Sequence, residues 1–430
     1  MIVKVPQFPW YGDTELELDF PSSWEVTVCR MAGHDAPKLT DLEIQAAFLN
    51  PIGTPRISHM ARGRKEVVII FDDLSRPTKV AELVPYVLQE LKEGGIKDET
   101  IRFIASVGAH GAMKLMDFVK KLGSDIVQRF PVYNHNPFQN CTYLGDTSRG
   151  TPVSINSEVM SCDLRIAVGS ILPHPVAGFG GGAKSILPGV AHIDSISANH
   201  RNVGGRSAPT PENPLGKLNP SVGWGKVEGN AVRLDMEAAA RMAGIDVIVN
   251  AIVNSHRDTV GLFVGDVIVA HREGVKLARQ MYATNLLGGV DIVVANAYSK
   301  ANEAMIAVDA GSKLLPERGG DLVITCNIPE GQICHYLSRS FGKNIGGHCW
   351  GRRTRLPSRA KRLLVLGPYV DRAGLDWIGP AELVNVANSW SELLDVLKRG
   401  HDARVRLAVI PDATLQYFPE LWADTTCTCV

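Results

Sequence analysis

Short runs of apolar, often β-branched residues recur along the chain, and each ends in a polar or glycine-rich turn. Continuous apolar runs are typical of strands that are buried on both faces, and their alternation with helical segments indicates parallel sheets covered by helices. The runs that follow this pattern are residues 65–73, 99–108, 162–170, 245–253, 290–298, 319–327, 360–368 and 404–412. The pattern therefore predicts an α/β protein with mainly parallel sheets.

Two of the helices between these runs have clear ends in the sequence. Residues 79–93 come directly after Thr78, a residue that caps helices well, and they stop before Gly94. Residues 231–243 stop at Gly244 in the same way. Both segments are predicted to be helices that connect strands.

The length of 430 residues exceeds what one hydrophobic core usually organises, so two α/β domains are expected. We place the boundary near residue 270, which gives an N-terminal domain of residues 1–270 and a C-terminal domain of residues 271–430. Residues 203–230 are dense in glycine, proline and asparagine and predict a long loop beside a site or a domain junction. The active site is expected in the cleft between the domains, with the C-terminal domain closing over the substrate.

Charge and composition exclude several kinds of partner. The 45 basic residues balance the 45 acidic residues and aromatic residues are sparse, so the sequence has no electrostatic footprint for nucleic acid or a membrane surface. No apolar run approaches the roughly 18 residues of a membrane span, and the N-terminus lacks the features of a signal peptide. We therefore expect a cytoplasmic protein with a small-molecule partner and no contact with nucleic acid or membrane.

The eight cysteines include no CxxC pair, which is typical of buried thiols rather than of disulfides or a zinc cluster. The exception is the C-terminal tail CTCV, in which Cys427 and Cys429 could bind metal or oxidise. The alternative interpretation of this tail is a frayed terminus.

Four loops after predicted strands carry candidate chemistry, because ligands of open α/β sheets bind outside the carboxyl ends of the strands. The loop DDLSRPT contains Arg76, whose planar guanidinium suits a carboxylate or a phosphate; a plain helix start is the alternative. The loop GAHG places His110 between two glycines, although a lone histidine is more often structural. The third loop is residues 173–189, and the fourth contains Lys300.

The third loop, PHPVAGFGGGAKSILPG, places Lys184 at the exit of a run of glycines. Bare backbone amides in such a loop can cradle a phosphate, and the lysine can reach what is bound there. The letters GFGGGAKS nearly match the phosphate loop GxxxxGK[ST] and differ only where Ala183 replaces the second required glycine. Imidazoles lie nearby, with His174 before the lysine, and suggest acid/base or metal chemistry more than nucleotide hydrolysis.

This loop resembles the signature of the lactate racemase family, the nickel-pincer enzymes, in its His-Pro, glycine run, lysine and Ile-Leu-Pro-Gly. The resemblance implies that Lys184 is joined through a thioamide to a pyridinium-3,5-bisthiocarboxylic acid mononucleotide, which holds nickel by sulfur, carbon and sulfur. It implies that His200 is the fourth nickel ligand, and such donors suit a square-planar Ni(II) centre. The implied activity is racemisation or epimerisation of a 2-hydroxy acid, by oxidation to a transient 2-keto acid and hydride return to the opposite face.

Further residues acquire roles through the same resemblance. DDLSRPT is similar to the family's DDxxRPT, so Arg76 is expected to face substrate and cofactor, and His110 and His174 are expected to be the paired general acid/bases. Histidine suits this task because it can accept or donate a proton near neutral pH, whichever way round the substrate lies. His192 is either a partner close to the nickel site or a helix-entry residue. The residues expected to bind the cofactor, besides Lys184, are Asp72, Ser75, Thr78, Gly178, Gly180, Gly181 and Gly182.

The sequence departs from the family after the strand expected at 290–295. Family members carry there a Tyr-Gln pair and a lysine that helps to hold the substrate carboxylate, whereas residues 296–309 lack the pair and place Asp309 near the position of that lysine. A moved cation changes how much substrate fits beside the nickel, so we predict a 2-hydroxy acid other than lactate, larger or with a second polar group. The alternative cations are Lys300, Arg76 and the arginines of the stretch 352–359. The surrounding segment 341–359 is either a solvated basic loop or a lid that faces an anion.

Two other functions remain open from the sequence. A phosphate-loop NTPase or kinase would explain GFGGGAKS, but not Ala183 or the neighbouring histidines. A nucleotide-binding or cofactor-storage protein would keep Lys184 but would have no need for His110 with His174. A racemase of this kind would depend on separate cofactor-biosynthesis enzymes, and a homo-oligomer is among the assembly states left open.

Overall fold

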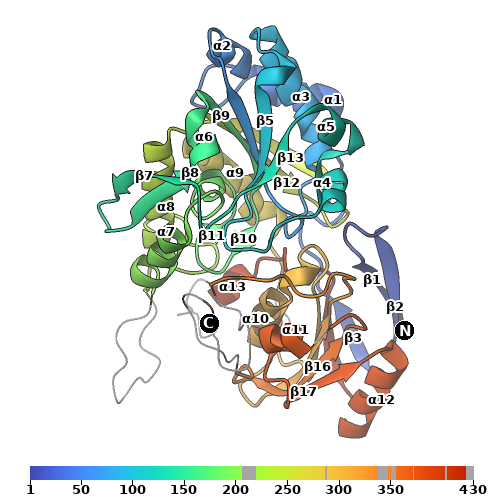
Figure 1. Cartoon of the computed structure of the whole chain (residues 1–430). Helices are drawn as coiled ribbons and strands as arrows, with labels where there is room; N and C mark the ends of the chain where they lie inside the picture. Colours follow the sequence, from blue (N-terminus) through green and yellow to red (C-terminus); the bar gives the residue numbers. More distant parts are fainter. Residues whose placement is uncertain are drawn as a thin grey trace. The chain divides into compact units, whose positions relative to one another are not determined.

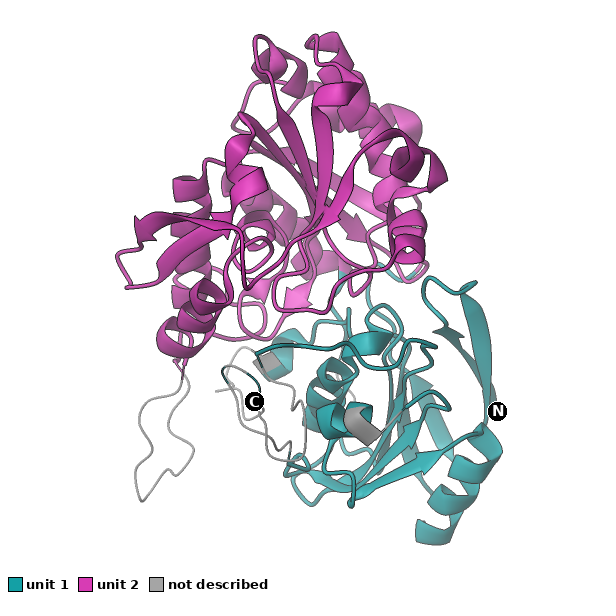
Figure 2. Cartoon of the chain, in the orientation of Figure 1, with its two compact units in different colours: residues 1–34, 282–430 teal, residues 35–281 magenta. Residues whose placement is uncertain are grey.

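The computed structural model describes residues 1–205, 219–285, 288–337, 347, 349, 355–370, 372–401 and 404–422 (Figure 1). The chain divides into two compact units, of which unit 2 comprises residues 35–281 and unit 1 comprises residues 1–34 and 282–430 (Figure 2). This division differs from the predicted domains, because the boundary follows residue 281 and the first 34 residues belong with the C-terminal part. The reason is a long-range pairing in unit 1, where β3 (Glu25–Val28) lies parallel to β18 (Arg406–Ile410). The expected cleft between two domains stays a prediction.

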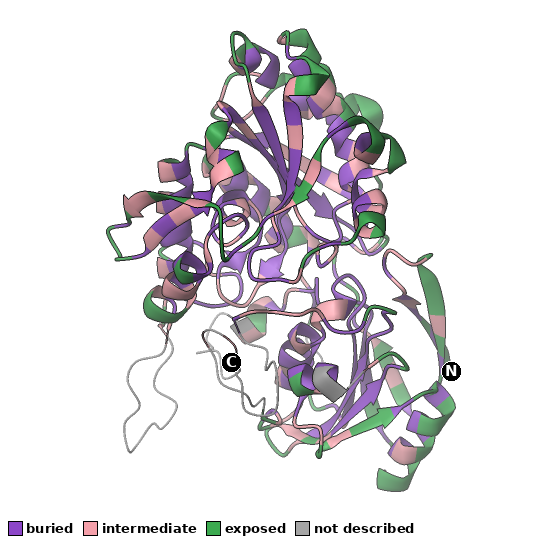
Figure 3. Cartoon of the chain, viewed as in Figure 1, coloured by how far each residue is buried: buried purple, intermediate pink, exposed green. Residues whose placement is uncertain are grey.

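Unit 2 is built on a six-stranded sheet with the order β13-β12-β9-β4-β5-β6. All neighbouring strands run parallel except β13, which pairs antiparallel with β12 at the edge. The central strands are almost completely buried, as their continuous apolar sequences require (Figure 3). The strands are β4 (Val67–Phe71), β5 (Ile101–Ala105), β6 (Val132–Asn134), β9 (Leu164–Ser170), β12 (Val247–Val253) and β13 (Thr259–Gly265).

Helices and two small hairpins complete unit 2 (Figure 1). The hairpins are β7 (Cys141–Asp146) with β8 (Pro152–Asn156), and β10 (Pro173–His174) with β11 (Gly178–Phe179). The helical elements are α1 (Asp41–Leu49), α2 (Ile57–Ala61), α3 (Val80–Glu93), η1 (Asp98–Thr100), α4 (Leu115–Leu122), α5 (Ser124–Arg129), α6 (Ser157–Ser161), η2 (Gly182–Ser185), α7 (Ile193–Ser197), η3 (Ala198–Val203), α8 (Ala231–Ala243) and α9 (Val269–Met281).

Unit 1 contains a second six-stranded sheet with the order β17-β16-β15-β14-β18-β3, in which all neighbours are parallel. A separate antiparallel hairpin is formed by β1 (Ile2–Gln7) and β2 (Thr14–Asp19). The other strands are β14 (Ile292–Asn296), β15 (Gly320–Thr325), β16 (Ala360–Leu366) and β17 (Val384–Ala387). The helical elements are η4 (Ala301–Glu303), α10 (Met305–Leu314), α11 (Arg372–Ile378), α12 (Trp390–Gly400) and α13 (Pro419–Trp422).

The predicted fold class is confirmed, since each of the apolar runs contains a strand and both main sheets are predominantly parallel. The helix predicted at 231–243 is also confirmed, with Asn230 as its cap. The expected cap of α3 is wrong, because Thr78 makes no capping bond and its hydroxyl is used elsewhere. Among the described residues, no helix is both long enough and apolar enough to cross a membrane.

Candidate active site

Three loops that carry predicted site residues follow adjacent strands of the unit 2 sheet. Strands β9, β4 and β5 are parallel neighbours, so the loops that follow them leave the same edge of the sheet (Figure 1). Gly108 N donates to Gly189 O at 2.9 Å and joins the His110 loop to the end of the lysine loop. The topology thus gathers the candidate chemistry at the edge where α/β sheets bind their ligands.

The imidazole of His110 is oriented by the carboxylate of Asp73. His110 Nδ1 lies 2.6 Å from Asp73 Oδ2, and both side chains are buried. Burial alone would raise the pKa of this carboxyl, but its contacts with His110, Arg76 and Ser75 outweigh burial and hold the pKa well below its usual range. An ionised carboxylate accepts the proton on Nδ1, so His110 Nε2 carries the lone pair and can act as a base.

Ser75 and Arg76 complete this part of the loop. Ser75 donates its backbone N–H to Asp73 Oδ1 at 2.9 Å, and its hydroxyl donates to the same oxygen. Arg76 Nη1 in turn donates to Ser75 O at 2.9 Å and to Ser75 Oγ at 2.8 Å. The serine expected to bind cofactor therefore links Asp73 to Arg76, and the substrate-facing role of Arg76 stays a prediction.

A buried lysine, Lys121 on α4, fastens the same loop from behind. Its Nζ lies 2.6 Å from Asp72 Oδ1 and donates to the carbonyls of Asp73 and Arg76, each at 3.0 Å. Thr78 Oγ1 donates to the other oxygen of Asp72 at 2.6 Å. Burial lowers the pKa of Lys121 and raises the pKa of Asp72. Asp72 and Thr78, both expected to bind cofactor, are therefore also parts of the loop's internal support.

His174 opens the lysine loop and lies against Lys184. Its Nδ1 accepts the backbone N–H groups of Val176 and Ala177, each at 3.1 Å, and its Nε2 lies 3.1 Å from Lys184 Nζ. A ring nitrogen that accepts hydrogen bonds carries no proton, so the proton of neutral His174 lies on Nε2. Its contact with Lys184 is then a hydrogen bond when the lysine amine is neutral and accepts that proton, since an ammonium group has no lone pair. One predicted acid/base residue and the predicted anchoring lysine are thus brought together.

Protein groups hold the glycine run on both sides of its backbone. Gly180 N donates to Leu172 O at 2.6 Å, Gly182 N donates to Asn250 Oδ1 at 2.7 Å, and His271 Nε2 donates to Gly180 O at 2.8 Å. A Cβ added at Gly182, whose φ is +58°, would lie 2.9 Å from the His271 ring. The amides of Gly180 and Gly182 are thus bonded to protein acceptors in this structure, and their expected role in binding a phosphate stays a prediction. The phosphate-binding roles of Gly178 and Gly181 stay predictions.

His200 lies in η3, a π-helical turn of a kind often found at functional sites. Its Nδ1–H donates to Ile196 O at 3.0 Å, which leaves Nε2 as the nitrogen with a lone pair. Burial lowers the pKa of His200 to about 4, so the ring is neutral at pH 7. A neutral imidazole whose second nitrogen is fixed by a carbonyl is the form that binds metals. His200 therefore fits the role of a single donor to nickel.

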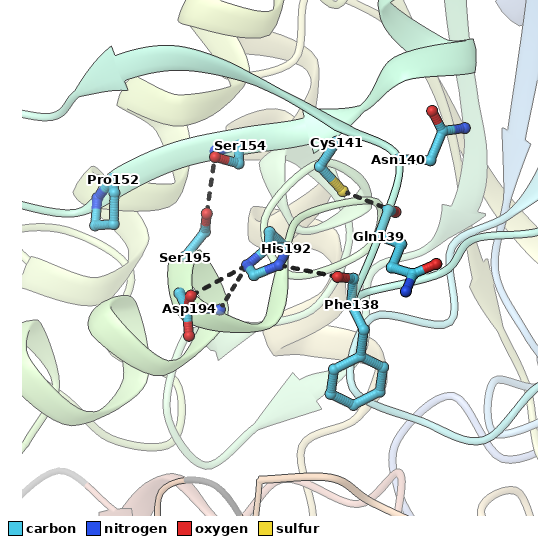
Figure 4. Close-up of a pocket in the computed structure, with 9 residues that line it drawn as sticks. All are labelled: Phe138, Gln139, Asn140, Cys141, Pro152, Ser154, His192, Asp194 and Ser195. Atoms are coloured by element: carbon cyan, nitrogen blue, oxygen red, sulfur yellow. Dashed lines mark hydrogen bonds and ion pairs between the residues drawn. The ribbon is translucent and has the colours of Figure 1, made fainter.

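His192 has the contacts of a helix-entry residue. His192 Nδ1 accepts the backbone N–H of Asp194 at 3.2 Å, so His192 is the N-cap of α7. His192 Nε2 lies 3.3 Å from Phe138 O. Figure 4 shows this histidine in the wall of a polar cavity of about 380 Å³, in which Cys141 Sγ and Ser195 Oγ also bond to nearby backbone groups. These contacts support the helix-entry alternative for His192.

Clusters of metal-binding side chains give no further site among the described residues. Within the described parts of the chain, no group of three or more His, Cys, Asp or Glu side chains is placed to hold a metal ion.

In unit 1, the predicted Lys300 follows β14 and is buried, with 1% of its surface exposed. Its backbone N–H donates to Thr414 Oγ1 at 3.1 Å. Asp309, near the position of the family's lysine, forms an ion pair with Lys313 Nζ at 3.1 Å one turn later on α10. These contacts show how both segments are packed, and the carboxylate-binding role of Lys300 stays a prediction.

The arginine-rich stretch is described only in part. Arg359 donates to the carbonyls of Lys313 and Leu315, each at 3.2 Å, so one of its arginines supports the end of α10. Arg352 and Arg353 lie outside the described residues, as do Cys427 and Cys429 of the tail. The choice between a solvated loop and a lid therefore stays open.

The structural setting of Lys184 counts against a phosphate-loop NTPase. Such a loop leads directly from a strand into a helix that begins at the Gly-Lys motif. Here the hairpin of β10 and β11 intervenes after β9, and Lys184 lies in η2, a 3-10 turn of 4 residues. The next helix, α7, begins only at Ile193.

Sequence reasoning missed several residues that position the site. It assigned Asp72 in DDLSRPT but not Asp73, and it did not identify Lys121. Lys121 lies on the face of α4 that buries Phe118 and Leu122, and a lysine on an apolar helix face is the signal that could have identified it. The same signal marks Arg233 and Asp235, which are buried on α8.

Comparisons with known proteins agree with this picture. The lactate racemase N-terminal domain family matches residues 11–210. The lactate racemase of Thermoanaerobacterium thermosaccharolyticum is 30% identical over 290 residues, which are 66% of this chain and 65% of that protein. The lactate racemase of Lactiplantibacillus plantarum is 29% identical over 306 residues, which are 68% of each protein. The matched segments thus span only about two thirds of either relative.

Two solved structures share the fold. The lactate racemase apoprotein of T. thermosaccharolyticum matches with a TM-score of 0.70 and 22% identity over 97% of this chain and 100% of that chain. A Thermotoga maritima protein from a structural genomics programme matches with a TM-score of 0.60 and 15% identity over 89% and 99%. At these identities the likeness is one of architecture.

Proposed function

The chain belongs to the lactate racemase family, and we propose that it is a 2-hydroxy acid racemase or epimerase that works with a nickel-pincer nucleotide attached to Lys184. The observation that carries the proposal is the contact of His174 Nε2 with Lys184 Nζ at 3.1 Å, on a loop that is bonded to the His110 loop. This arrangement provides an anchoring amine and two imidazoles for proton transfer at one edge of one sheet.

Each residue has a role that follows from its surroundings. Lys184 would anchor the nucleotide, and His200 Nε2 would donate to nickel, since its Nδ1–H is already bonded to Ile196 O. When bound, the nucleotide supplies an acceptor for the hydrogen on the carbinol carbon. The hydroxyl proton is then left to the protein, and His110 Nε2 is the available base because Asp73 holds the proton on Nδ1.

His174 supports the reverse proton movement in this proposal. Its Nε2–H can hydrogen-bond the oxygen of the keto intermediate, because the two backbone amides at Nδ1 keep the ring proton on that side. The proton that completes the product hydroxyl is the one that His110 accepted, so the neutral ring of His174 keeps its own proton. Arg76, half-buried on the His110 side, is the described cation of unit 2 best suited to the substrate carboxylate. We infer that two histidines of opposite polarity serve the two faces of the substrate.

The substrate we propose is a 2-hydroxy acid other than lactate, larger or with a second polar group. The support is the absence of the family's Tyr-Gln pair in residues 296–309, together with the pairing of Asp309 with Lys313. Specificity constants of the loaded enzyme for lactate and for longer or dicarboxylic 2-hydroxy acids test this choice. A clear preference for lactate would contradict it and would mean that another cation substitutes without changing the substrate.

The central experiment compares Lys184→Ala with wild type after co-expression with cofactor-biosynthesis enzymes. Wild type is expected to carry a nucleotide adduct on Lys184 and bound nickel, and the variant neither. Lys226→Ala is the matched control, because its backbone lies against Gly178 of the same loop, and it should keep both adduct and nickel. The measurements are intact mass, peptide mapping and metal content.

The outcomes separate the competing functions. An adduct that persists on another residue of Lys184→Ala would overturn the assignment of the anchor. An adduct on Lys184 with no turnover of any chiral 2-hydroxy acid would favour cofactor storage. Release of phosphate from ATP by a protein without an adduct would favour the NTPase.

A further inference from the structure

Helix α8 contacts both the lysine turn η2 and the π-helical turn η3 that contains His200. Arg233 and Asp235, two buried residues of this helix, face these different partners. Residues two positions apart lie about 200° apart around a helix axis, so their side chains leave α8 on nearly opposite sides. One helix therefore packs against both of the turns that contain the residues proposed to hold the cofactor.

Arg233 binds the carbonyl side of the glycine run. Its guanidinium donates to Gly181 O at 3.0 Å, to Ala177 O at 3.4 Å and to Phe179 O. Burial lowers the pKa of Arg233 to about 9, so the group is still charged at neutral pH. Alternate carbonyls of the loop thus turn toward one cation, and this orientation fixes the backbone that enters Lys184.

Asp235 binds the turn that contains His200. Its carboxylate accepts bonds from Asn199 Nδ2 at 2.7 Å, from Thr151 Oγ1 at 2.7 Å and from Thr147 Oγ1 at 2.5 Å. Asn199 precedes His200 in η3 and also donates to Val232 O of α8 at 3.3 Å. An ionised acceptor with three neutral donors is a strong and directional clamp, and it holds the π-helical turn against α8.

We propose that α8 sets the separation between Lys184 and His200, with Arg233 as the positioning residue of the anchor and Asp235 as the positioning residue of the nickel ligand. The inference rests on the proposed function for the identity of the group that spans the two residues. A rigid group that is attached at one point and ligated at another needs both points fixed within a fraction of an ångström. A substitution at Arg233 should then impair attachment to Lys184, and a substitution at Asp235 should impair nickel binding at His200.

Substitution of Asp235 should lower the nickel content without lowering the amount of adduct on Lys184. In Asp235→Asn, an amide nitrogen in place of Oδ2 would face Asn199 Nδ2 as one donor against another, so the bond that holds η3 to Asp235 would be lost. The adduct on Lys184 should form as in wild type, but nickel per adduct should fall, with the metal bound about tenfold more weakly. Asn199→Ala is a second variant, which removes the bonds of η3 to Asp235 and Val232 O but keeps the two threonine bonds to Asp235, and it should show the same direction of change.

Substitution of Arg233 should have the opposite effect, with less adduct on Lys184 and an unchanged ratio of nickel to adduct. Arg233→Lys keeps the charge but cannot reach three carbonyls with fixed geometry. The yield of adduct on Lys184 should fall severalfold, while the adduct that does form should retain nickel in the wild-type ratio. Glu237→Gln is the matched control for the Asp235 end, because Glu237 is a buried acid on the same helix that pairs with Arg272 at 2.6 Å. It should leave nickel per adduct unchanged. For the Arg233 end the control is Arg241→Lys, because Arg241 lies on the same helix and pairs with Asp266 at 2.7 Å.

Imidazole nitrogen NMR of the cofactor-free protein tests the inference independently of catalysis. The His200 signals, assigned by their loss in His200→Gln, should show a protonated Nδ1 and a bare Nε2 in wild type and in Glu237→Gln. Asp235→Asn and Asn199→Ala should show a mixture of tautomers. A single unchanged tautomer in both, with wild-type nickel content, would overturn the role of α8. Failure of wild type to form any adduct would instead overturn the proposed function, and the tautomers would still decide the role of Asp235.

Discussion

His110 and His174 lie on loops at the same edge of the unit 2 sheet, but their surroundings place the imidazole protons on opposite nitrogens. His110 Nδ1 faces the carboxylate of Asp73 at 2.6 Å, whereas His174 Nδ1 accepts two backbone N–H groups at 3.1 Å. Nε2 of His110 therefore carries a lone pair, and Nε2 of His174 carries a proton.

The difference teaches that two histidines of one site need not be interchangeable. His110 can gain a proton on Nε2 while the resulting charge stays beside Asp73. His174 can gain a second proton only by giving up the hydrogen bonds of Val176 and Ala177 to Nδ1. In the protein without cofactor, His110 is thus arranged to accept a proton and His174 is arranged to donate a hydrogen bond.

Removal of either imidazole is the strongest way to test this comparison. His110→Gln and His174→Gln should each lower turnover by about 100- to 10,000-fold, the range of general acid/base catalysis, while the adduct on Lys184 is retained. Chiral chromatography of the reaction and intact mass of the protein provide the measurements. Near-normal turnover in both variants would reject the pair.

The loop DDLSRPT, which carries the Asp73 partner of His110, depends on the buried cation Lys121. Lys121→Met leaves Asp72 buried without its charge partner and should lower the free energy of unfolding by about 3–5 kcal/mol, measured by denaturant titration. Lys121→Met combined with Asp72→Asn should recover most of this loss. Lys120→Met, on the less buried neighbour, serves as the control. A similar loss in single and double variants would contradict the pairing.

A third histidine, His135, shows how burial changes the pKa of an imidazole that has no proposed role in catalysis. Its Nε2 bonds Ala191 O at 2.9 Å and its Nδ1 bonds Asn156 at 3.1 Å, and burial lowers its pKa to about 4. The unfolded value is about 6.5, so the unfolded chain binds more protons below that pH. Its contribution to stability is full above about pH 6.5 and falls by up to about 3 kcal/mol as the pH drops toward 4.

Replacement of His135 tests whether this histidine lowers stability as the pH falls. His135→Asn should flatten the dependence of unfolding free energy on pH between about 4 and 6.5, as measured by denaturant titrations at several pH values. Turnover at neutral pH is expected to remain close to wild type. An equally steep dependence in the variant would assign the effect to other groups.

The mildest test changes only the partner of His110. Asp73→Asn keeps the size of the side chain but removes the charge that holds the proton on Nδ1, so turnover should fall by about 10- to 100-fold. Nitrogen NMR should show mixed tautomers for His110 and an unchanged tautomer for His174. If His174 changed equally, the two environments would not be independent.

Much of the fold could be predicted from local sequence. The runs 65–73 and 162–170 are apolar throughout because β4 and β9 are buried on both faces, and the helix of residues 231–243 ends at a glycine in the left-handed conformation. The assignment of the first 34 residues to unit 1 could not be predicted. It depends on β3, a short strand whose pairing with β18 joins segments from opposite ends of the chain.

Local sequence was enough to predict which loops carry the candidate chemistry, because motif residues that follow parallel strands emerge at one edge of the sheet. It thereby indicated the candidates Arg76, His110, His174 and Lys184 and the resemblance to lactate racemases. Tertiary structure alone decided the state of each group. The nitrogen that bears a proton, the glycine amides that are already bonded and the cation behind a loop depend on partners that are distant in sequence. His110 meets Asp73 across 37 positions, and Gly180 meets His271 across 91. Local patterns encode burial and periodicity, but hydrogen-bond partners are set only when the elements pack together.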